Sequence, residues 1–263
     1  MKSPLALLLA VLTITAFSGL VLPLDPFGME LGRAWEGPSA VHPCGRDGLG
    51  RDLLARLLVG SGTSFGLAAM SLGLALTLGV TLGGLAGWCG GLVDALVMRV
   101  VDLLMGIREL VLAIVIAVLI GPSGSAIILI LGVGYAAPLI RFVRSLILEQ
   151  RGRAHILAAV ALGAPPLHVV RRHILPNIAG PVAVRSAAVI GPLIQAEATL
   201  SFLGIGVQDP APSLGTLMRD GLTGLRSGPH LILITTAMIF LVVLAATLMA
   251  DAVRDSRDPR TLA

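Results

Sequence analysis

The stretch Arg151–Asn177, RGRAHILAAVALGAPPLHVVRRHILPN, decides how this chain is organised. It is a basic segment, punctuated by Gly and Pro, between two runs of almost pure hydrocarbon. A polar stretch between membrane spans faces water, and an excess of arginine marks the cytosolic side. Glu149 is the only acidic residue among the arginines in and just before this stretch, which are Arg141, Arg144, Arg151, Arg153, Arg171 and Arg172. We therefore place this loop in the cytosol.

The composition predicts a membrane protein that crosses the bilayer several times. Of 263 residues, 56% are hydrophobic and 13% are charged, whereas soluble domains carry about 25% charged residues. The basic residues flank apolar runs and are not interleaved with aromatic residues, which argues against nucleic-acid binding.

Six apolar runs are long enough to cross ~30 Å of hydrocarbon, so we predict an all-α integral membrane protein with six transmembrane helices. The first run follows Lys2 and could instead be a signal peptide, but it has no clean cleavage site. Alternation places segments 25–63 and 204–228 outside, and both termini in the cytosol. The predicted spans are 4–24, 64–88, 96–120, 125–147, 178–203 and 229–250.

This topology divides the chain into an N-terminal helix with an outer segment (1–63), a permease-like core (64–250) with a cytosolic loop at about 148–177, and a cytosolic tail (251–263). Cys44 and Cys89 fall on opposite faces of the membrane, so we expect no disulfide between them.

Glycine and proline positions predict close packing and kinks in the spans. Gly79, Gly83 and Gly87 are spaced four apart, which favours close approach of another helix, although membrane helices also tolerate glycine generally. Kinks are expected at Pro138, Pro181 and Pro192.

The basic loop is patterned as two short helices. Residues 154–162 favour a helix that stops at Gly163, and Pro165 and Pro166 suit the first turn of a second one. Pro176 is expected to end that second helix. An apolar stripe of Leu167, Val170 and Ile174 beside His168, Arg171 and Arg172 suits either a protein groove or anionic lipid headgroups.

Four sequence motifs indicate a family. Ala158-Ala159, Leu162-Gly163-Ala164 and RHILPN (172–177) resemble the coupling loop of binding-protein-dependent ABC importer permeases. HPCGRDGLGRD (42–52), EATLSFLGIGV (197–207) and the tail from Asp251 through Arg254-Asp255 to Asp258-Pro259-Arg260 resemble the C-type subunit of the dipeptide/oligopeptide/nickel branch.

The resemblance implies a type I (MetI-like) permease bundle in a bacterial inner membrane, importing a peptide or a nickel or metal-chelate solute. It also implies a second, unlike permease subunit, an extracytoplasmic solute-binding protein and two cytosolic ATPase subunits that bind ATP and Mg²⁺, with no cofactor in this chain. The ATPase would contact Ala158, Ala159, Leu162, Gly163, Ala164, Leu167, Val170, Arg171, Arg172, His173 and Pro176.

The chain departs from the family pattern in two places. Leu157 and Val160 stand where the loop usually has glutamate and arginine, which weakly favours a nickel-type importer over a peptide importer. Arg108-Glu109 stands where the third span is usually apolar, and each such charge costs roughly 2.5–3.5 kcal/mol.

Ionisable residues in spans are candidates for lining the transport path or for pairing between subunits. Asp102 also lies one helical turn from Arg99, which favours a local ion pair. The candidates are Asp102, Arg108, Glu109, Arg185 and Glu197.

Catalytic and metal-binding motifs are scarce. Lys2 is the only lysine, which excludes a phosphate-binding GxxxxGK[ST] loop, and HExxH does not occur. His42 and Cys44 could be half a metal site, but a turn set by Pro43 explains them better, so we predict no metal site. Rival interpretations are an autonomous secondary transporter or channel, for which no inverted repeat is visible, and a non-transporting membrane scaffold.

Overall fold

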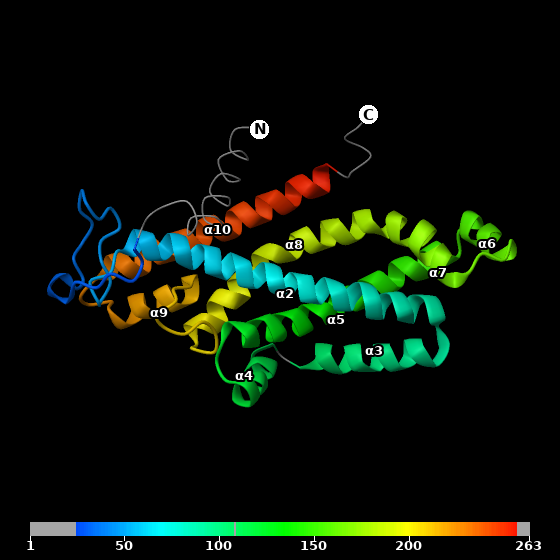
Figure 1. Ribbon diagram of the computed structural model, residues 1–263, viewed down its shortest axis with the longest axis horizontal. Coiled ribbons are helices and arrows are strands. Elements are labelled where there is room, and N and C mark those ends of the chain that lie inside the picture. The colour runs from blue at the N-terminus through cyan, green and yellow to red at the C-terminus, as the bar shows by residue number, and fades with distance from the viewer. Residues whose placement is uncertain (1–24, 108, 257–263) are drawn as a thin grey trace.

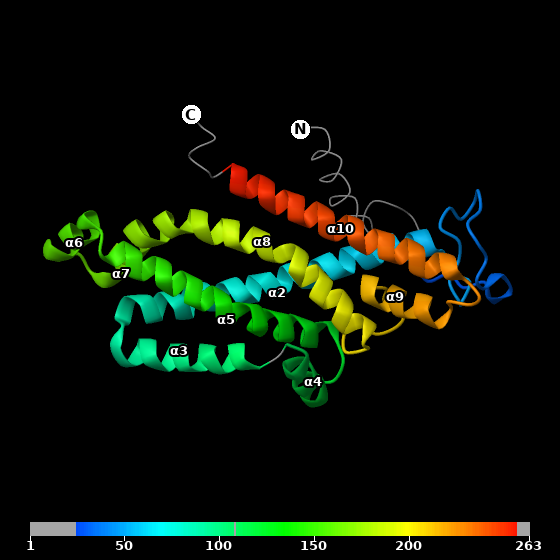
Figure 2. The same ribbon diagram turned by 180° about the vertical axis from the view of Figure 1, so that it is seen from behind.

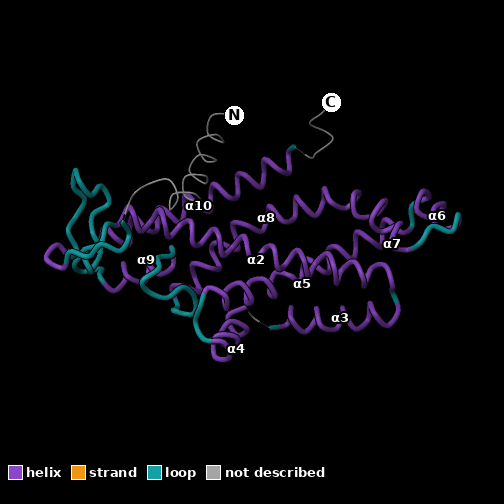
Figure 3. Tube along the Cα trace, viewed as in Figure 1, coloured by secondary structure: helices purple, strands orange, loops and turns teal. Residues whose placement is uncertain are grey.

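The computed structural model describes residues 25–107 and 109–256 of the chain. In this part the secondary structure is helical apart from one isolated bridge between Arg46 and Asp52 (Figure 3). The predicted span 4–24, Arg108 and the end of the tail lie outside the described residues.

Four helices of the described part are long and apolar enough to cross a membrane. They are α2 (Leu53–Cys89), α5 (Gly124–Arg151), the helix that runs through α8 (Leu175–Phe202) and α10 (Pro229–Asp255). They correspond to the predicted second, fourth, fifth and sixth spans. α2 begins earlier than predicted, because Asp52 caps its N-terminus by accepting the Ala55 N–H at 2.8 Å.

The predicted continuous third span, 96–120, is wrong. The chain instead forms α3 (Gly91–Gly106) and α4 (Glu109–Ile120), and the pair Gly91–Gly106 and Val111–Ile120 is bent by 99°. Counted as one broken span, it would be the fifth candidate among the described helices. The helix stops at Gly106, and the extended residue Ile107 (φ −90°, ψ 128°) separates it from the charged pair 108–109. A straight span would have carried both charges at mid-membrane, at the cost given above.

The predicted glycine face of α2 is confirmed as a close contact with α5. A Cβ placed on Gly83 would lie 2.6 Å from the Ile140 carbonyl oxygen, and one on Gly87 would lie 2.9 Å from Ile147 Cβ. General tolerance of glycine does not explain this arrangement, because the spacing follows the α5 backbone. The two helices run side by side in both views (Figures 1 and 2).

Prolines lie inside two of the long helices without ending them. Pro138 is inside α5, and Pro181 and Pro192 are inside α8, which curves along its length in Figure 1. The curve of α8 runs along the helix in which Pro181 and Pro192 are predicted to cause kinks, and the kink at Pro138 stays a prediction.

The long helices give the molecule two distinct ends. At one end, α6 (Ala154–Ala161) and α7 (Pro166–Val169) project past the end of α2 (Figure 1). At the other lie residues 25–52, including the short helix η1 (Leu31–Arg33), the first turns of α2 and α10, and α9 (Leu214–Thr223). The free cysteines Cys44 and Cys89 are separated by the length of α2, about 55 Å at 1.5 Å per residue.

Candidate functional site

The end formed by α6 and α7 carries an exposed apolar surface. Ile156 faces inward and is buried, whereas Leu157 and Val160 on the same helix are 57% and 50% exposed. Leu162 and Leu167, on either side of the turn after α6, are 88% and 69% exposed. We call Leu157, Val160, Leu162 and Leu167 the apolar tip. Exposed leucines gathered on a projecting turn mark a surface that a partner could cover.

The turn at Gly163 fixes the shape of this tip. Gly163 has a positive φ of 80°, its N–H donates to the Val160 carbonyl at 2.9 Å, and the Ala164 N–H donates to the Ala159 carbonyl at 3.1 Å. This pair of bonds is a Schellman helix end, which strongly favours glycine at the left-handed position. The predicted helix and its stop are therefore confirmed.

The predicted apolar stripe of Leu167, Val170 and Ile174 does not form a docking face. Ile174 is fully buried against Ile147 and Ile178, Val170 is half-buried, and only Leu167 is exposed. The second helix lies against the bundle, so its inner face belongs to the core. The exposed apolar residues are instead largely those of the first helix. Two of them, Leu157 and Val160, are the positions at which this chain departs from the family pattern.

The prediction that Pro176 ends the second helix is wrong. A π-helical turn, η2 (Val170–Ile174), follows α7 and leads directly into α8, with the Leu175 N–H donating to the Val170 carbonyl. Pro176 then falls in the first turn of α8, where a missing N–H costs little. The chain is therefore helical from Pro166 to Phe202.

The structure gathers the predicted coupling residues at this end. Ala158, Leu162, Gly163, Leu167, Arg171, Arg172 and Pro176 are exposed, whereas Ala159, Ala164, Val170 and His173 are half-buried.

Two of the arginines before the loop are paired with aspartates of α3. Arg144 binds Asp94 through two nitrogens, with Nη2–Oδ2 at 2.5 Å, and Arg141 Nη2 lies 2.5 Å from Asp102 Oδ1. The expected Arg99–Asp102 pair is therefore wrong, and Glu149 is not the only counter-charge. These pairs could not be predicted from local spacing, because 39 positions separate Arg141 from Asp102 and 50 separate Arg144 from Asp94.

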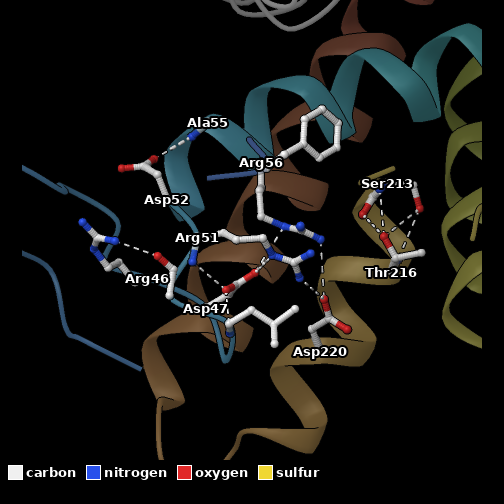
Figure 4. Close-up of polar contacts among 12 residues, drawn as sticks. Arg46, Asp47, Arg51, Asp52, Ala55, Arg56, Ser213, Thr216 and Asp220 are labelled. Carbon is white, nitrogen blue, oxygen red and sulfur yellow. Dashed lines mark hydrogen bonds and ion pairs between the residues drawn. The ribbon is translucent and has the colours of Figure 1, made fainter. Parts of the chain in front are cut away.

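At the opposite end, buried charges join α2 to α9. Asp47 accepts from Arg51 Nε at 2.6 Å and lies 3.4 Å from Arg56 Nε. Asp220 Oδ2 on α9 lies 3.7 Å from Arg56 Nη2 and 3.9 Å from Arg51 Nη2 (Figure 4). We call Asp47, Arg51, Arg56 and Asp220 the α2–α9 charge cluster. Arg56 has no exposed surface, and burial raises the pKa of Asp220, with Arg56 opposing that shift.

α9 is held there by further polar contacts. Ser213 and Thr216 form a capping box at its start, visible in Figure 4, and the Leu214 N–H donates to Ser64 Oγ of α2 at 3.1 Å.

His42 has a structural place at the same end. Arg46 Nη2 lies 2.7 Å from His42 Nε2 and can only donate, so His42 Nδ1 carries the proton and donates to Asp52 Oδ2 at 2.5 Å. Both ring nitrogens are thus engaged within the chain. Burial, followed by the nearby Asp52 carboxylate, raises the pKa of the Cys44 thiol. Within residues 25–107 and 109–256, no group of three or more His, Cys, Asp or Glu could hold a metal ion.

Two further ionisable candidates, Glu197 and Arg185, are on α8. Glu197 is fully buried on α8 and accepts from Ser201 Oγ at 2.7 Å, while Ser201 Oγ also accepts the Val207 N–H at 3.4 Å. It therefore supports the turn after α8 in this structure. Arg185 is exposed on the same helix. Arg108 and the Glu109 side chain are outside the described part.

Comparisons with known proteins agree on one family. Residues 79–262 match the family described as "Binding-protein-dependent transport system inner membrane component". A probable peptide ABC transporter permease protein of Sinorhizobium fredii, y4tQ, is 36% identical over 96% of this chain and 85% of its own length. A glutathione transport system permease protein, GsiD of Pectobacterium atrosepticum, is 32% identical over 96% of this chain and 84% of its own length.

Another relative and a solved structure extend this picture. A dipeptide transport system permease protein, DppC of Alkalihalophilus pseudofirmus, is 31% identical over 86% of this chain and 74% of its own. In fold, the chain is similar to one in an inward-facing MetNI methionine ABC transporter, with a TM-score of 0.58 and 22% identity over 76% of this chain and 96% of that one. This chain therefore belongs to the inner-membrane components of binding-protein-dependent transport systems and is a permease subunit of an ABC importer.

Proposed function

We propose that this permease subunit imports peptides, delivered by an extracytoplasmic binding protein and driven by ATP and Mg²⁺ bound to two cytosolic ATPase subunits. The names of three relatives, which refer to peptides, dipeptides and the tripeptide glutathione, support this substrate class over nickel or a metal chelate. A second, unlike permease subunit would complete the path, and both termini of this chain would lie in the cytosol.

The exposed apolar tip carries the coupling part of this proposal. Its leucines project from the end of the bundle on a turn fixed by Gly163, so they can enter a groove on an ATPase. The helix behind the tip continues into α8, so movement of a docked tip reaches the membrane core. Because Leu157 and Val160 replace a charged pair, contact on this side would depend on apolar burial rather than on ion pairing.

The opposite end would face the binding protein. Residues 25–52 and α9 lie there, and the α2–α9 charge cluster holds them to the start of α2. This arrangement gives a delivering protein a fixed surface instead of loose loops.

The test is peptide-dependent ATP hydrolysis and peptide uptake by the whole transporter in liposomes. The double variant Leu157→Asp/Leu162→Asp should leave the chain in the membrane and abolish both activities, since two carboxylates cannot enter an apolar groove cheaply. Leu92→Asp is the matched control, because Leu92 is 83% exposed in the first turn of α3, where aspartate is favourable.

Each outcome has a distinct meaning. Unaltered peptide-dependent hydrolysis in the double variant would overturn the coupling role of the tip. Uptake by this chain alone, without ATP, would instead favour an autonomous transporter. ATPase binding with no stimulation by any peptide would favour a non-transporting scaffold.

A further inference from the structure

An apolar groove lies between the end of α2 and the second helix of the loop. Val80, Leu85 and Trp88 of α2 form one wall, Ile147 of α5 contributes to its lining, and Leu167 and Val170 form the opposite wall. The groove has a volume of about 470 Å³, within the ~300–1,000 Å³ typical of ligand sites. Its lining is almost entirely apolar, so it suits an apolar group.

A basic pocket adjoins this groove. It measures about 660 Å³ and is lined by Pro165, Leu167, His168, Arg171 and Arg172. Leu167 and Arg171 line both hollows, so the apolar groove and the basic pocket are neighbours that share these two side chains. Arg151 adds a third guanidinium close by, because it lies over the Trp88 ring at 5.5 Å and donates to the Gly87 carbonyl at 3.0 Å.

The arginines that border these two hollows have no carboxylate partner in the described part of the chain. Arg141, Arg144 and Arg153 are paired with Asp102, Asp94 and Glu149, whereas Arg151, Arg171 and Arg172 form no salt bridge there. Among the arginines in and just before the loop, the unpaired ones are therefore those beside the groove and the pocket. A tryptophan beside arginines at the end of two spans is typical of the boundary between hydrocarbon and water.

We propose that this groove and pocket bind one anionic phospholipid, with an acyl chain along the apolar groove and the phosphate at Arg171 and Arg172. Phosphate oxygens suit the forked N–H donors of arginine, and basic pockets between transmembrane helices bind anionic headgroups. A neutral lipid would fill the groove but leave the guanidinium groups without a counter-charge. The bound lipid joins α2 to the helix that carries Leu167, so it steadies the apolar tip.

Lipid retention by the whole transporter tests this site. The complex, purified in mild detergent, is mixed with phosphatidylglycerol or phosphatidylcholine, and bound lipid is counted by native mass spectrometry without ATP. The double variant Arg171→Gln/Arg172→Gln should retain roughly tenfold less phosphatidylglycerol and unchanged phosphatidylcholine. Arg153→Gln is the matched control, because Arg153 is an exposed loop arginine that lines neither hollow and is paired with Glu149.

A second variant approaches the site from its apolar side. Gly84 lines the groove, and the nearest atom to a Cβ placed there is Ile147 Cδ1 at 3.9 Å. The Cβ of Gly84→Leu would therefore meet α5 only at an ordinary contact distance, and its side chain would occupy the groove, so this variant should also lower phosphatidylglycerol retention. Equal retention of phosphatidylglycerol in all variants would overturn the proposal.

A protein segment in the groove would also overturn it. If a protein segment occupied the groove, a cysteine introduced by Leu85→Cys would cross-link to the second permease subunit or to residues 1–24. No lipid would then be retained. Because retention is measured without ATP or peptide, this result would leave the proposed coupling role of the tip untouched.

Discussion

Arg56 places a guanidinium at a position with no exposed surface. Such burial is costly unless carboxylates lie close, and Asp47 and Asp220 lie 3.4 and 3.7 Å from it. Its three guanidinium nitrogens make no hydrogen bond with any described residue, so the charges of these two carboxylates are its principal compensation. The contact of α9 with α2 therefore depends on the charge of a few side chains.

Asp220 gives this contact a predicted pH dependence. Its pKa is raised by burial, so the folded chain holds the proton more tightly than the unfolded chain does. The stability contributed by protonation is complete below the ordinary aspartate pKa of about 4 and is lost as the pH rises through the raised value. Asp220→Asn should flatten this part of a plot of Tm against pH. Parallel curves for the two proteins would contradict it.

Residue identity alone predicted little of this cluster. The segment HPCGRDGLGRD was recognised as a family motif, but no local pattern pairs Arg56 with Asp220, because they are distant in sequence and on different helices. By contrast, Gly163 correctly predicted where the first loop helix ends. The left-handed position of a Schellman helix end favours glycine whatever the tertiary fold.

At the scale of elements, α2 and α5 form the central pair of the bundle, and their spacing depends on glycine. Gly83→Ala should destabilise the folded permease by about 1–3 kcal/mol, because its Cβ would meet the Ile140 carbonyl oxygen at 2.6 Å. Gly73→Ala is the control on the same helix, since nothing lies within 4 Å of a Cβ there. Thermal unfolding in detergent measures both, and equal loss in the two variants would rule out the contact as the cause.

The two ion pairs between α3 and α5 should differ in strength. Arg144 and Asp94 side chains are 28% and 21% exposed, and those of Arg141 and Asp102 are 47% and 57% exposed. Double-mutant cycles with Asp94→Asn/Arg144→Gln should give a coupling of about 1–3 kcal/mol, and the outer pair less than about 1 kcal/mol. A larger coupling energy for Arg141 and Asp102 would show that the exposure of the side chains does not decide which ion pair is stronger.

Periodicity predicted most of the long helices but missed how they turn. Apolar runs located α5, α8 and α10 closely, because a membrane span must be continuous hydrocarbon. The break after Gly106 went unpredicted although the charged pair 108–109 marks its position in the sequence. The π turn at Val170–Ile174 has no such local signal. The last residue of this π turn, Ile174, is the member of the expected docking stripe that lies in the core.

At the scale of the whole molecule, the predicted orientation can be checked with native cysteines. Cys89 is exposed and is the last residue of α2, whose end lies near the projecting helices α6 and α7. In intact cells it should be protected from a membrane-impermeant maleimide and should react once the cells are permeabilised. Ser39→Cys, exposed at the opposite end, should react in intact cells. Labelling of Cys89 from outside would reverse the topology.

The helix is unbroken from Pro166 to Phe202, so a movement of its loop end is carried to its far end. At 1.5 Å per residue its 37 residues measure about 55 Å, so a tilt of about 10° at one end moves the other by about 10 Å. This helix can bend at Pro181, at Pro192 and at the π turn. In the proposed coupling, bending at these positions would shorten the movement that reaches the far end of α8, and stiffening any one of them would lengthen that movement.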